Sequence, residues 1–276
     1  MSATRWTPDD IVNLDRYPIA DLANPERKAL VERCRRSLDS DRYFVLPEFV
    51  RPKALAAMVE DAMANRSNAY ANRSFRNCFL QRRKDASLPE DHPRNIFFDS
   101  GIHMIAADYF AETAPLKVFY HARAVMDFVA ETVGLPKLYP NEDPLQPANV
   151  ACYEEGDRSE WHFDSDNDFT MTLMLQAAEE GGEFEIAPNM RTKTEEHTDI
   201  LRSVLKGDRS RVVRVPREPG ALVIFRGTNS VHRVTEVRGP KLRLMGVFVY
   251  EEKPGVIGDP EVNMTVYGRT GREEAA

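Results

Sequence analysis

This chain is poor in the features that mark secreted, disulfide-bonded and membrane proteins. Among 276 residues it has three cysteines, Cys34, Cys78 and Cys152, with no C-x-x-C spacing, so the sequence predicts neither a disulfide framework nor a thiolate metal site. No apolar run approaches the length that crosses a membrane, and the opening MSATRWTPDD lacks the basic-then-apolar order of a secretory signal. We therefore expect a cytoplasmic protein with no membrane partner.

Acidic residues outnumber basic ones. The chain has 37 Lys and Arg against 44 Asp and Glu, which gives a formal net charge of -7 and a pI near 5.5. A protein that binds phosphate backbones needs a basic face, so we expect no nucleic-acid partner. Basic residues cluster in QRRK (81–84) and LKGDRSRVVRVPR (205–217), and without interleaved aromatic residues we interpret both as solvated loops.

Helical patterns occupy the first half of the chain. Asn24, Pro25 and Glu26 form a helix start, and the apolar residues that follow recur at helical spacing. The expected elements are helices over about 25–39, 52–64 and 115–133, and a short strand over 43–46. The polar segment 65–92 predicts a long irregular excursion of the kind that serves as a lid over a substrate.

From Asn149 onward the pattern changes to short strands separated by turn residues. The strand-like runs are NVACYEE (149–155), DFTMTLMLQ (168–176), EFEIA (183–187), RVVRV (211–215), ALVIFR (221–226) and LRLMGVFVY (242–250). Strands separated by turns rather than by helices imply antiparallel sheets, closed as a sandwich or a double-sheet barrel. The sequence therefore predicts an α+β chain with helices first and a β-barrel second.

The stretch WHFD (161–164) holds the first candidate for chemistry. On a strand, His162 and Asp164 project to one face while Phe163 projects to the other. A lone His-x-Asp pair is commonly a hydrogen-bonded surface pair, but His232 can return beside it in a sheet. Two imidazoles and one carboxylate on one face suit Fe(II) and leave coordination positions open for catalysis. The other histidines lack partners at ligand spacing, and we expect them to be structural or surface residues: His92, His103, His121 and His197.

Arg243 is the next candidate. Gly239 and Pro240 predict a turn after the strand of His232, so the following strand would run back alongside it and bring Arg243 near the metal. The planar guanidinium fork grips a carboxylate through two hydrogen bonds, which an ammonium cannot do. An open metal site beside such a fork suits a small dicarboxylate cosubstrate.

These motifs, in the order YEEGDRSEWHFD, GGEFEIAPN, PGALVIFRG, HRVTEV and LRLMGVFVY, resemble the iron(II)/2-oxoglutarate-dependent oxygenases. The resemblance implies a double-stranded β-helix core, a jelly-roll or cupin-like fold with N-terminal and flanking helices. It implies Fe(2+), 2-oxoglutarate and O2 as cofactors, with iron bound by His162, Asp164 and His232. Arg243 would hold the far carboxylate of 2-oxoglutarate, and Tyr153 is a further candidate for a cosubstrate contact. The implied reaction is hydroxylation of an unactivated C–H bond with release of succinate and CO2.

The whole chain also resembles the bacterial subgroup of these enzymes that hydroxylate or halogenate free amino acids. In the halogenating members a small residue replaces the carboxylate ligand, so Asp164 predicts hydroxylation. A zwitterionic substrate requires a cation for its carboxylate and an anion for its amine. The candidates for the carboxylate are Arg76, Arg94 and Asn95, and those for the amine are Glu142 and Asp143. Ser165 and Asp166 are ambiguous between substrate contacts and solvated turn residues.

We expect one catalytic domain over residues 1–276. Within it, 1–147 would be mainly helical support and substrate lid, 148–252 the β-helix core with the metal site, and 253–276 a C-terminal tail. Two other functions use the same sequence features. One is hydroxylation or demethylation of a protein or nucleic acid, and the other is a non-catalytic β-barrel that binds a metal or small ligand.

Overall fold

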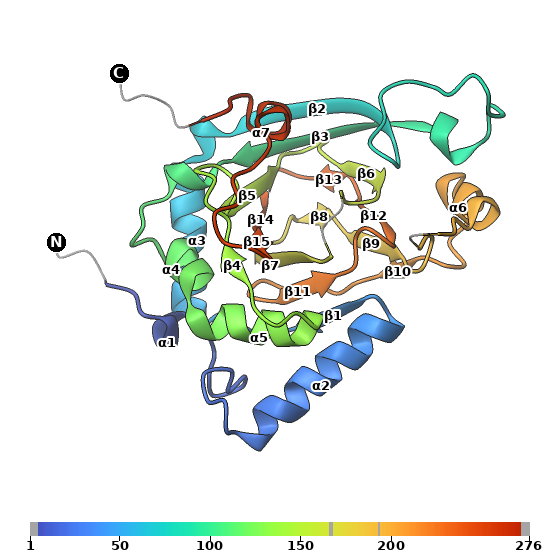
Figure 1. The fold of residues 1–276 in the computed structure, drawn as a ribbon. Helices are drawn as coiled ribbons and strands as arrows, with labels where there is room; N and C mark the ends of the chain where they lie inside the picture. Colours follow the sequence, from blue (N-terminus) through green and yellow to red (C-terminus); the bar gives the residue numbers. More distant parts are fainter. Residues whose placement is uncertain (1–4, 166–167, 193, 272–276) are drawn as a thin grey trace.

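Two antiparallel β-sheets face each other in the computed structural model, which describes residues 5–165, 168–192 and 194–271 (Figure 1). The larger sheet contains, in spatial order, β1 (Tyr43–Leu46), β11 (Leu222–Phe225), β7 (Thr170–Gln176), β14 (Arg243–Phe248), β5 (Ala148–Tyr153), β3 (Phe97–Ile105) and β2 (Tyr70–Asn77). The smaller sheet contains β10 (Val213–Arg214), β9 (Phe184–Ala187), β12 (Val231–Val234) and β6 (Ser159–His162). Two short pairs complete the strands: β13 (Val237–Arg238) with β8 (Glu180–Gly181), and β15 (Tyr250–Glu251) with β4 (Tyr139–Pro140). The expected α+β class with a double-sheet β core is confirmed.

The strands of the larger sheet separate two hydrophobic cores. On β5, Ala151 and Tyr153 face the smaller sheet and pack with Phe184 and Ile186. The alternate residue Val150 faces the opposite way, into the core under the helices. Because alternate residues face opposite sides of the sheet, one set of side chains lines the interior between the two sheets. The candidate active site lies in this interior.

Helices cover the outer face of the larger sheet (Figure 1). They are α1 (Pro8–Ile11), α2 (Pro25–Ser40), α3 (Pro52–Ala64), α4 (Pro115–His121) and α5 (Arg123–Val133). The helix start at Asn24 is confirmed, because its side chain accepts a hydrogen bond from the Glu26 N–H at 2.8 Å, with Pro25 in the first turn. The helices expected over 25–39 and 52–64 and the strand over 43–46 are present.

The single helix expected over 115–133 is wrong, because the chain breaks at Ala122 between α4 and α5. Ala122 has extended backbone angles, φ -64° and ψ 115°. The carbonyl of Tyr120, which a continuous helix would use for the N–H of residue 124, accepts a hydrogen bond from the Tyr250 hydroxyl at 2.7 Å. A partner 130 residues away therefore supports the break.

The irregular excursion expected over 65–92 is also wrong in part, because β2 lies inside it. This strand pairs with β3 from Tyr70 opposite Met104 to Asn77 opposite Phe97, and the hairpin extends the larger sheet by two strands. Its sequence YANRSFRN places polar residues on both faces, so it lacks the apolar alternation by which strands are recognised. The first 147 residues thus contribute three strands to the larger sheet as well as helices.

The remaining helices lie near the smaller sheet and at the C-terminal end. α6 (Thr198–Leu205) packs with Trp161 and Phe163 on the outer side of the smaller sheet, and α7 (Pro260–Tyr267) buries Tyr267 near β2 and β3. Single 3₁₀ turns occur at η1 (Arg66–Asn68), η2 (Pro93–Asn95) and η3 (Ala107–Tyr109). Among the described residues, no helix has the length and apolar character needed to cross a bilayer. All three cysteines are buried free thiols.

Candidate active site

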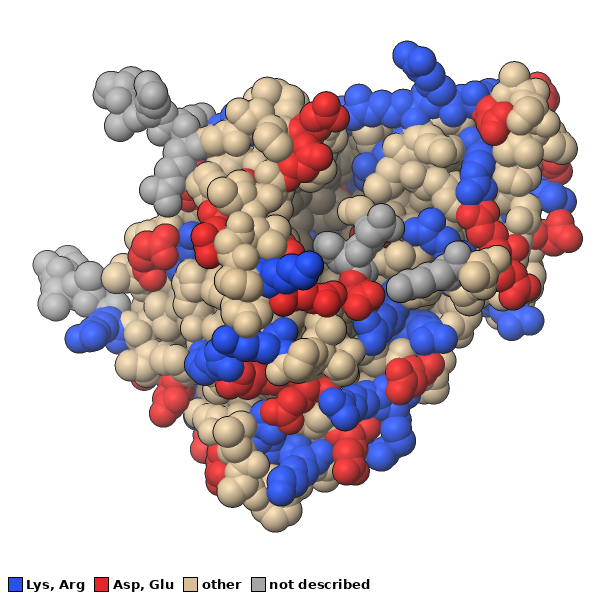
Figure 2. Space-filling model, viewed as in Figure 1, with Lys and Arg blue, Asp and Glu red and all other residues tan. Residues whose placement is uncertain are grey.

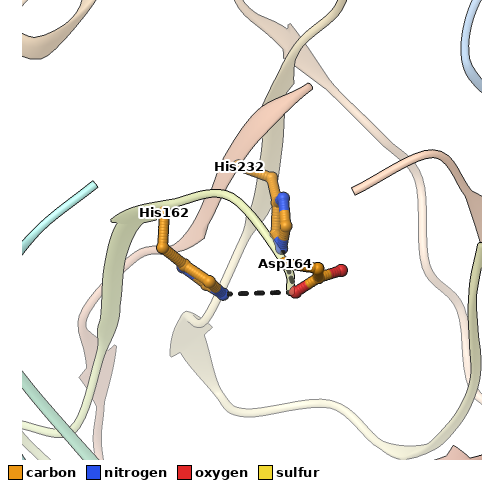
Figure 3. Close-up of side chains that lie close together, drawn as sticks. All are labelled: His162, Asp164 and His232. Atoms are coloured by element: carbon orange, nitrogen blue, oxygen red, sulfur yellow. Dashed lines mark ion pairs between the residues drawn. The ribbon is translucent and has the colours of Figure 1, made fainter. Parts of the chain in front are cut away.

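His162, Asp164 and His232 meet inside the barrel (Figure 3). Strands β6 and β12 pair so that His232 lies directly opposite His162, and the two imidazole centroids are 4.3 Å apart. Asp164 Oδ1 lies 3.4 Å from His232 Nε2 and 3.8 Å from His162 Nε2. Within the described part of the chain this is the one group of three or more His, Cys, Asp and Glu side chains close enough to share a metal ion.

Asp164 reaches this position from a loop and not from a strand. β6 ends at His162, so the expectation that both residues occupy one strand is wrong, although both point inward. Phe163 faces the other way and packs on Phe79, with ring centroids 5.4 Å apart. The Asp164 N–H donates to the carbonyl of Gly227 at 3.2 Å, which fixes the loop in place of a ladder.

Backbone carbonyls orient both imidazoles for metal binding. Nδ1 of His162 lies 2.7 Å from the Glu160 carbonyl oxygen, and Nδ1 of His232 lies 3.0 Å from the Ser230 carbonyl oxygen. A carbonyl only accepts, so each Nδ1 carries the hydrogen and each Nε2 turns its lone pair toward Asp164. Histidine ligands in metal sites are oriented in this way, and the donor set therefore fits a divalent metal.

The protonation states also suit a metal. Burial, with a further contribution from nearby His232, lowers the pKa of His162 to about 3, so its imidazole is neutral. Burial alone would raise the pKa of Asp164, but the positive charge that His232 and His162 carry when protonated, together with the hydroxyl of Thr170, holds it well below its usual range. Metal ligands must be deprotonated, and a carboxylate beside a neutral imidazole meets that requirement.

Two residues confine the Asp164 carboxylate. The hydroxyl of Thr170 donates to Oδ2, which leaves Oδ1 to face the histidines. On the other side the carboxylate lies against the α-carbon of Gly227, where an added Cβ would overlap Oδ2 and come within 2.7 Å of Cγ. Neither Thr170 nor Gly227 was expected from the sequence, because their roles depend on contact with a loop that precedes them in the chain by 6 and 63 residues.

Replacing Gly227 by alanine should therefore displace the carboxylate and weaken iron binding. We expect the Fe(II) dissociation constant to rise about tenfold, the range typical for groups that orient metal ligands. Anaerobic Fe(II) titration measures the change. Gly271→Ala is the matched control, because a Cβ there meets no atom within 4 Å. Equal iron affinity in both variants would show that the carboxylate does not depend on this contact.

Arg243 lies in the same interior, but it comes from the opposite sheet. β14 pairs with β5 and β7 and not with β12, so the expectation that Arg243 would lie on a strand beside that of His232 is wrong. In the β14–β5 register Arg243 lies opposite Tyr153, and its guanidinium carbon is 4.9 Å from that ring centroid. Its Nε donates to the carbonyl of Gly182 at 2.8 Å.

The other two nitrogens of Arg243 are buried without a hydrogen-bond partner. They border a cavity of about 370 Å³ beside β8 and β9. Gly182 permits this arrangement, because it has a φ of +62° and an added Cβ would lie 2.7 Å from the Arg243 side chain. A buried cation with two unused donors needs an anion, and a carboxylate fits the fork.

Arg217 is a second guanidinium in this cavity, and the sequence interpretation missed it. The interpretation of 205–217 as a solvated loop is wrong at Arg217, because its Nε and Nη2 are buried without a hydrogen-bond partner. Burial, with a further contribution from Arg243, lowers its pKa well below the usual value. Its pattern, V-P-R-E-P-G, resembles an ordinary turn and contains no signal of burial.

Two of the candidate substrate residues lie near the candidate metal ligands. Arg76, on β2, has a buried Nε without a hydrogen-bond partner. Burial is the main cause that lowers its pKa, while the negative charge of Asp164 acts in the opposite direction. Ser165 borders the cavity that also contains Asp164.

The structure gives the other candidates different partners. Arg94 forms a two-point ion pair with Glu196, at 2.7 and 2.8 Å, and the amide of Asn95 binds the backbone of 85–89. Asp143 accepts hydrogen bonds from the Asn263 side chain and the Leu145 N–H, and exposed Glu142 accepts one from the Gly255 N–H. Asp166 lies outside the described residues.

A second cavity, of about 400 Å³, opens beside Asp164 of the candidate metal ligands. Asp164 and Ser165 border it at one end, and residues of β5, β14 and α7 form its walls. The space-filling view shows a hollow on this face above the barrel, with acidic side chains near its rim (Figure 2). The Oδ1 atom of Asn149, which borders the cavity, is buried without a hydrogen-bond partner. One cavity thus lies on the arginine side of the barrel and the other opens to solvent.

The chain matches one family model and resembles several solved structures. Residues 26–256 match the model of a family described as Halogenase D. Among solved structures, an oxidoreductase of the 2OG-Fe(II) oxygenase family from Burkholderia pseudomallei is 14% identical with a TM-score of 0.51, covering 82% of this chain and 92% of its own. AviO1 from Streptomyces viridochromogenes Tue57 is 17% identical with a TM-score of 0.55, covering 86% and 100%. The epimerase SnoN, in complex with Fe3+, alpha ketoglutarate and nogalamycin RO, is 14% identical with a TM-score of 0.54, covering 84% and 93%. A search of curated proteins finds no match.

At such identities the solved structures show a shared fold, and the jelly-roll architecture expected from the sequence is confirmed. Iron(II), 2-oxoglutarate and O2 are the cofactors that this site fits. Two imidazoles and one carboxylate match Fe(II) with open positions, and the unpartnered Arg243 fork matches a dicarboxylate.

Proposed function

Because the chain belongs to the Halogenase D family, we propose that it is an Fe(II)- and 2-oxoglutarate-dependent oxygenase that hydroxylates a C–H bond of a free amino acid. Succinate and CO2 are the products from the cosubstrate. The observation that supports this most is the conjunction of the His162, Asp164 and His232 group with the unpartnered fork of Arg243 inside one barrel. A non-catalytic β-barrel that only binds a metal or a small ligand would not require both a three-ligand metal site and a buried, unpaired arginine.

In this proposal His162, Asp164 and His232 would hold the iron, and the iron would supply the oxidising power for the reaction. The carbonyls of Glu160 and Ser230 hold the imidazoles, and the hydroxyl of Thr170 holds the carboxylate. Each of these contacts comes from the protein itself and fixes the orientation of one proposed ligand side chain.

The cosubstrate enters on the arginine side. Arg243 holds the far carboxylate of 2-oxoglutarate, and the ring of Tyr153 forms the neighbouring wall. The keto acid end then points toward the histidines. Burial excludes water from this charge pair, which strengthens it relative to a pair at the surface.

The amino acid enters through the hollow opposite. Of the five candidates for the zwitterion, Arg76 has a free buried donor near Asp164, whereas the carboxylate of Asp143 is already used to hold α7. We assign Arg76 to the substrate carboxylate and the unpartnered Asn149 oxygen to a substrate N–H. Both assignments satisfy buried polar atoms that the protein leaves open.

Asp164 makes the product an alcohol. A carboxylate ligand occupies the coordination position that a halide would need, and the contacts with Thr170 and Gly227 keep it there. The proposed reaction therefore differs from that in the family's name. The difference depends on one side chain.

Anaerobic absorption spectroscopy tests the proposal. We expect a visible charge-transfer band when 2-oxoglutarate is added to the Fe(II) protein, and a change in that band when the correct amino acid is added from a panel. Product analysis by mass spectrometry after O2 is admitted should then show a gain of one oxygen. Iron binding without a band would exclude the oxygenase, and a band that only peptides or nucleic acids perturb would exclude the amino-acid substrate.

A further inference from the structure

The guanidinium of Arg217 is buried against an aromatic ring and has no acidic partner among the described residues. Its guanidinium carbon is 3.5 Å from the ring centroid of Phe184, and its Nη1 lies 3.0 Å from the sulfur of Met245. Neither neighbour is an anion, and Nε and Nη2 have no hydrogen-bond partner. A buried cation without a counter-charge destabilises the fold, so the position requires a reason beyond packing.

The cavity that Arg217 borders also contains the unpartnered fork of Arg243. Two like charges that face one small cavity repel each other. Among the described residues, no acidic side chain forms an ion pair with either of them, while exposed Arg214 on the same cavity is paired with Glu183. Four glutamates also line this cavity, and among the described residues none of them forms an ion pair with Arg217 or Arg243: Glu179, Glu180, Glu183 and Glu218. Four buried guanidinium nitrogens therefore remain without a hydrogen-bond partner, two on each arginine.

The aromatic rings connect this charge to the metal ligands. Phe184, on which Arg217 stacks, lies 5.7 Å from the ring of His232, and Phe225 lies 4.9 Å from it. The ring of Phe184 thus lies between Arg217 and the proposed iron ligand His232. A ligand that binds in the cavity on the arginine side would be within reach of both guanidinium groups.

We propose that Arg217 and Arg243 form a two-arginine clamp on the distal carboxylate of a bound dicarboxylate. The identification of that dicarboxylate as 2-oxoglutarate rests on the proposed function, but the clamp itself does not require iron. Each carboxylate oxygen accepts from more than one donor, so one carboxylate can satisfy both forks. The clamp selects a dicarboxylate over a keto acid with one carboxylate, because the latter would leave two buried cations unpaired.

A purely structural role is the alternative, since Arg217 also fills the space over Phe184. Arg217→Met separates the two roles, because methionine keeps an unbranched apolar stem on the ring and removes the charge. Arg217→Lys restores the charge without the fork. Arg36→Met is the control, since it removes an exposed, ion-paired arginine on α2 that borders neither cavity.

The experiment is isothermal titration calorimetry of the full-length protein with 2-oxoglutarate and with 2-oxobutyrate, in metal-free and in anaerobic Fe(II) forms. We expect Arg217→Met to raise the dissociation constant of 2-oxoglutarate about tenfold or more and to leave that of 2-oxobutyrate unchanged. Arg217→Lys should recover part of the affinity, and Arg36→Met should match the unmodified protein. If Arg217→Met does not fold, Arg217→Lys should still show the loss for 2-oxoglutarate alone.

Two results would overturn the clamp. One is an unchanged 2-oxoglutarate affinity in Arg217→Met, and the other is an equal loss for both keto acids, which indicates a structural role. The charge-transfer band distinguishes the clamp from the proposed function. Dicarboxylate binding that depends on Arg217 without a band supports the clamp and excludes the oxygenase. A charge-transfer band together with an unchanged 2-oxoglutarate affinity in Arg217→Met supports the oxygenase and excludes the clamp.

Discussion

Replacing His232 by alanine should abolish iron binding and succinate formation. His232 supplies one of three nitrogen and oxygen donors, and its Nε2 lies 3.4 Å from Asp164 Oδ1. Loss of a group that merely orients a ligand costs about 10- to 100-fold in affinity, and loss of the ligand itself should exceed that upper value. Anaerobic Fe(II) titration and succinate quantification measure both effects.

The control is His121→Ala, which removes a histidine that is half exposed on α4. It should leave iron affinity unchanged. Because His232 is buried among aromatic rings, its alanine variant also leaves a cavity, so thermal unfolding must confirm a folded protein. His162→Ala, at a less buried position, should lose iron in the same way. Retained iron binding in either variant would falsify the assignment of the triad.

The grouping of His162, Asp164 and His232 could be predicted from the sequence because the chemistry of a metal site restricts which residues can serve. Two histidines and an aspartate in the right order suit few other sites, and the register of β6 against β12 then brings them together. The position of Arg243 in the interior could be predicted for the same reason, since only a guanidinium offers a planar fork. Its route to the site could not be predicted, because a turn after β12 does not reveal that β14 joins the opposite sheet.

Burial of polar residues is the part that the sequence concealed. β2 has no apolar alternation because Arg76 points into the barrel and Phe75 points to solvent, the reverse of the usual arrangement. Arg217 was missed for a related reason, since a basic residue between two prolines is normally at the surface. Both are side chains whose cost of burial a ligand would offset, so a pattern based on hydrophobicity assigns them to the wrong environment.

The break between α4 and α5 shows a different limit. Residues 115–133 favour a helix throughout, and the interruption at Ala122 coincides with a hydrogen bond from Tyr250. Local propensity cannot reveal a competing donor that is 130 residues away.

Asp164→Gly should abolish hydroxylation and open a coordination position next to Gly227. The substitution removes Oδ1, the one atom that faces both imidazoles, and releases the hydroxyl of Thr170. We expect hydroxylated product and succinate to fall more than about a hundredfold, as for loss of His232. Removing the carboxylate also removes a negative charge, so chloride should raise iron affinity in the variant and not in the unmodified protein. Iron titration with and without chloride measures this, and mass spectrometry identifies the products.

Asp168→Gly is the matched control, because it makes the same change at an exposed acid of the same loop and should preserve both iron affinity and hydroxylation. Because the family is described as Halogenase D, the product that the unmodified protein forms in chloride tests the role of Asp164 most directly. With Asp164 as a ligand, chloride has no position beside the iron, so the product in excess chloride should remain the alcohol. A chlorinated main product from the unmodified protein would mean that Asp164 does not stay on the iron during turnover. The contacts of the carboxylate with Thr170 and Gly227 argue against such a movement, because its displacement would break a hydrogen bond and leave Oδ2 without a donor.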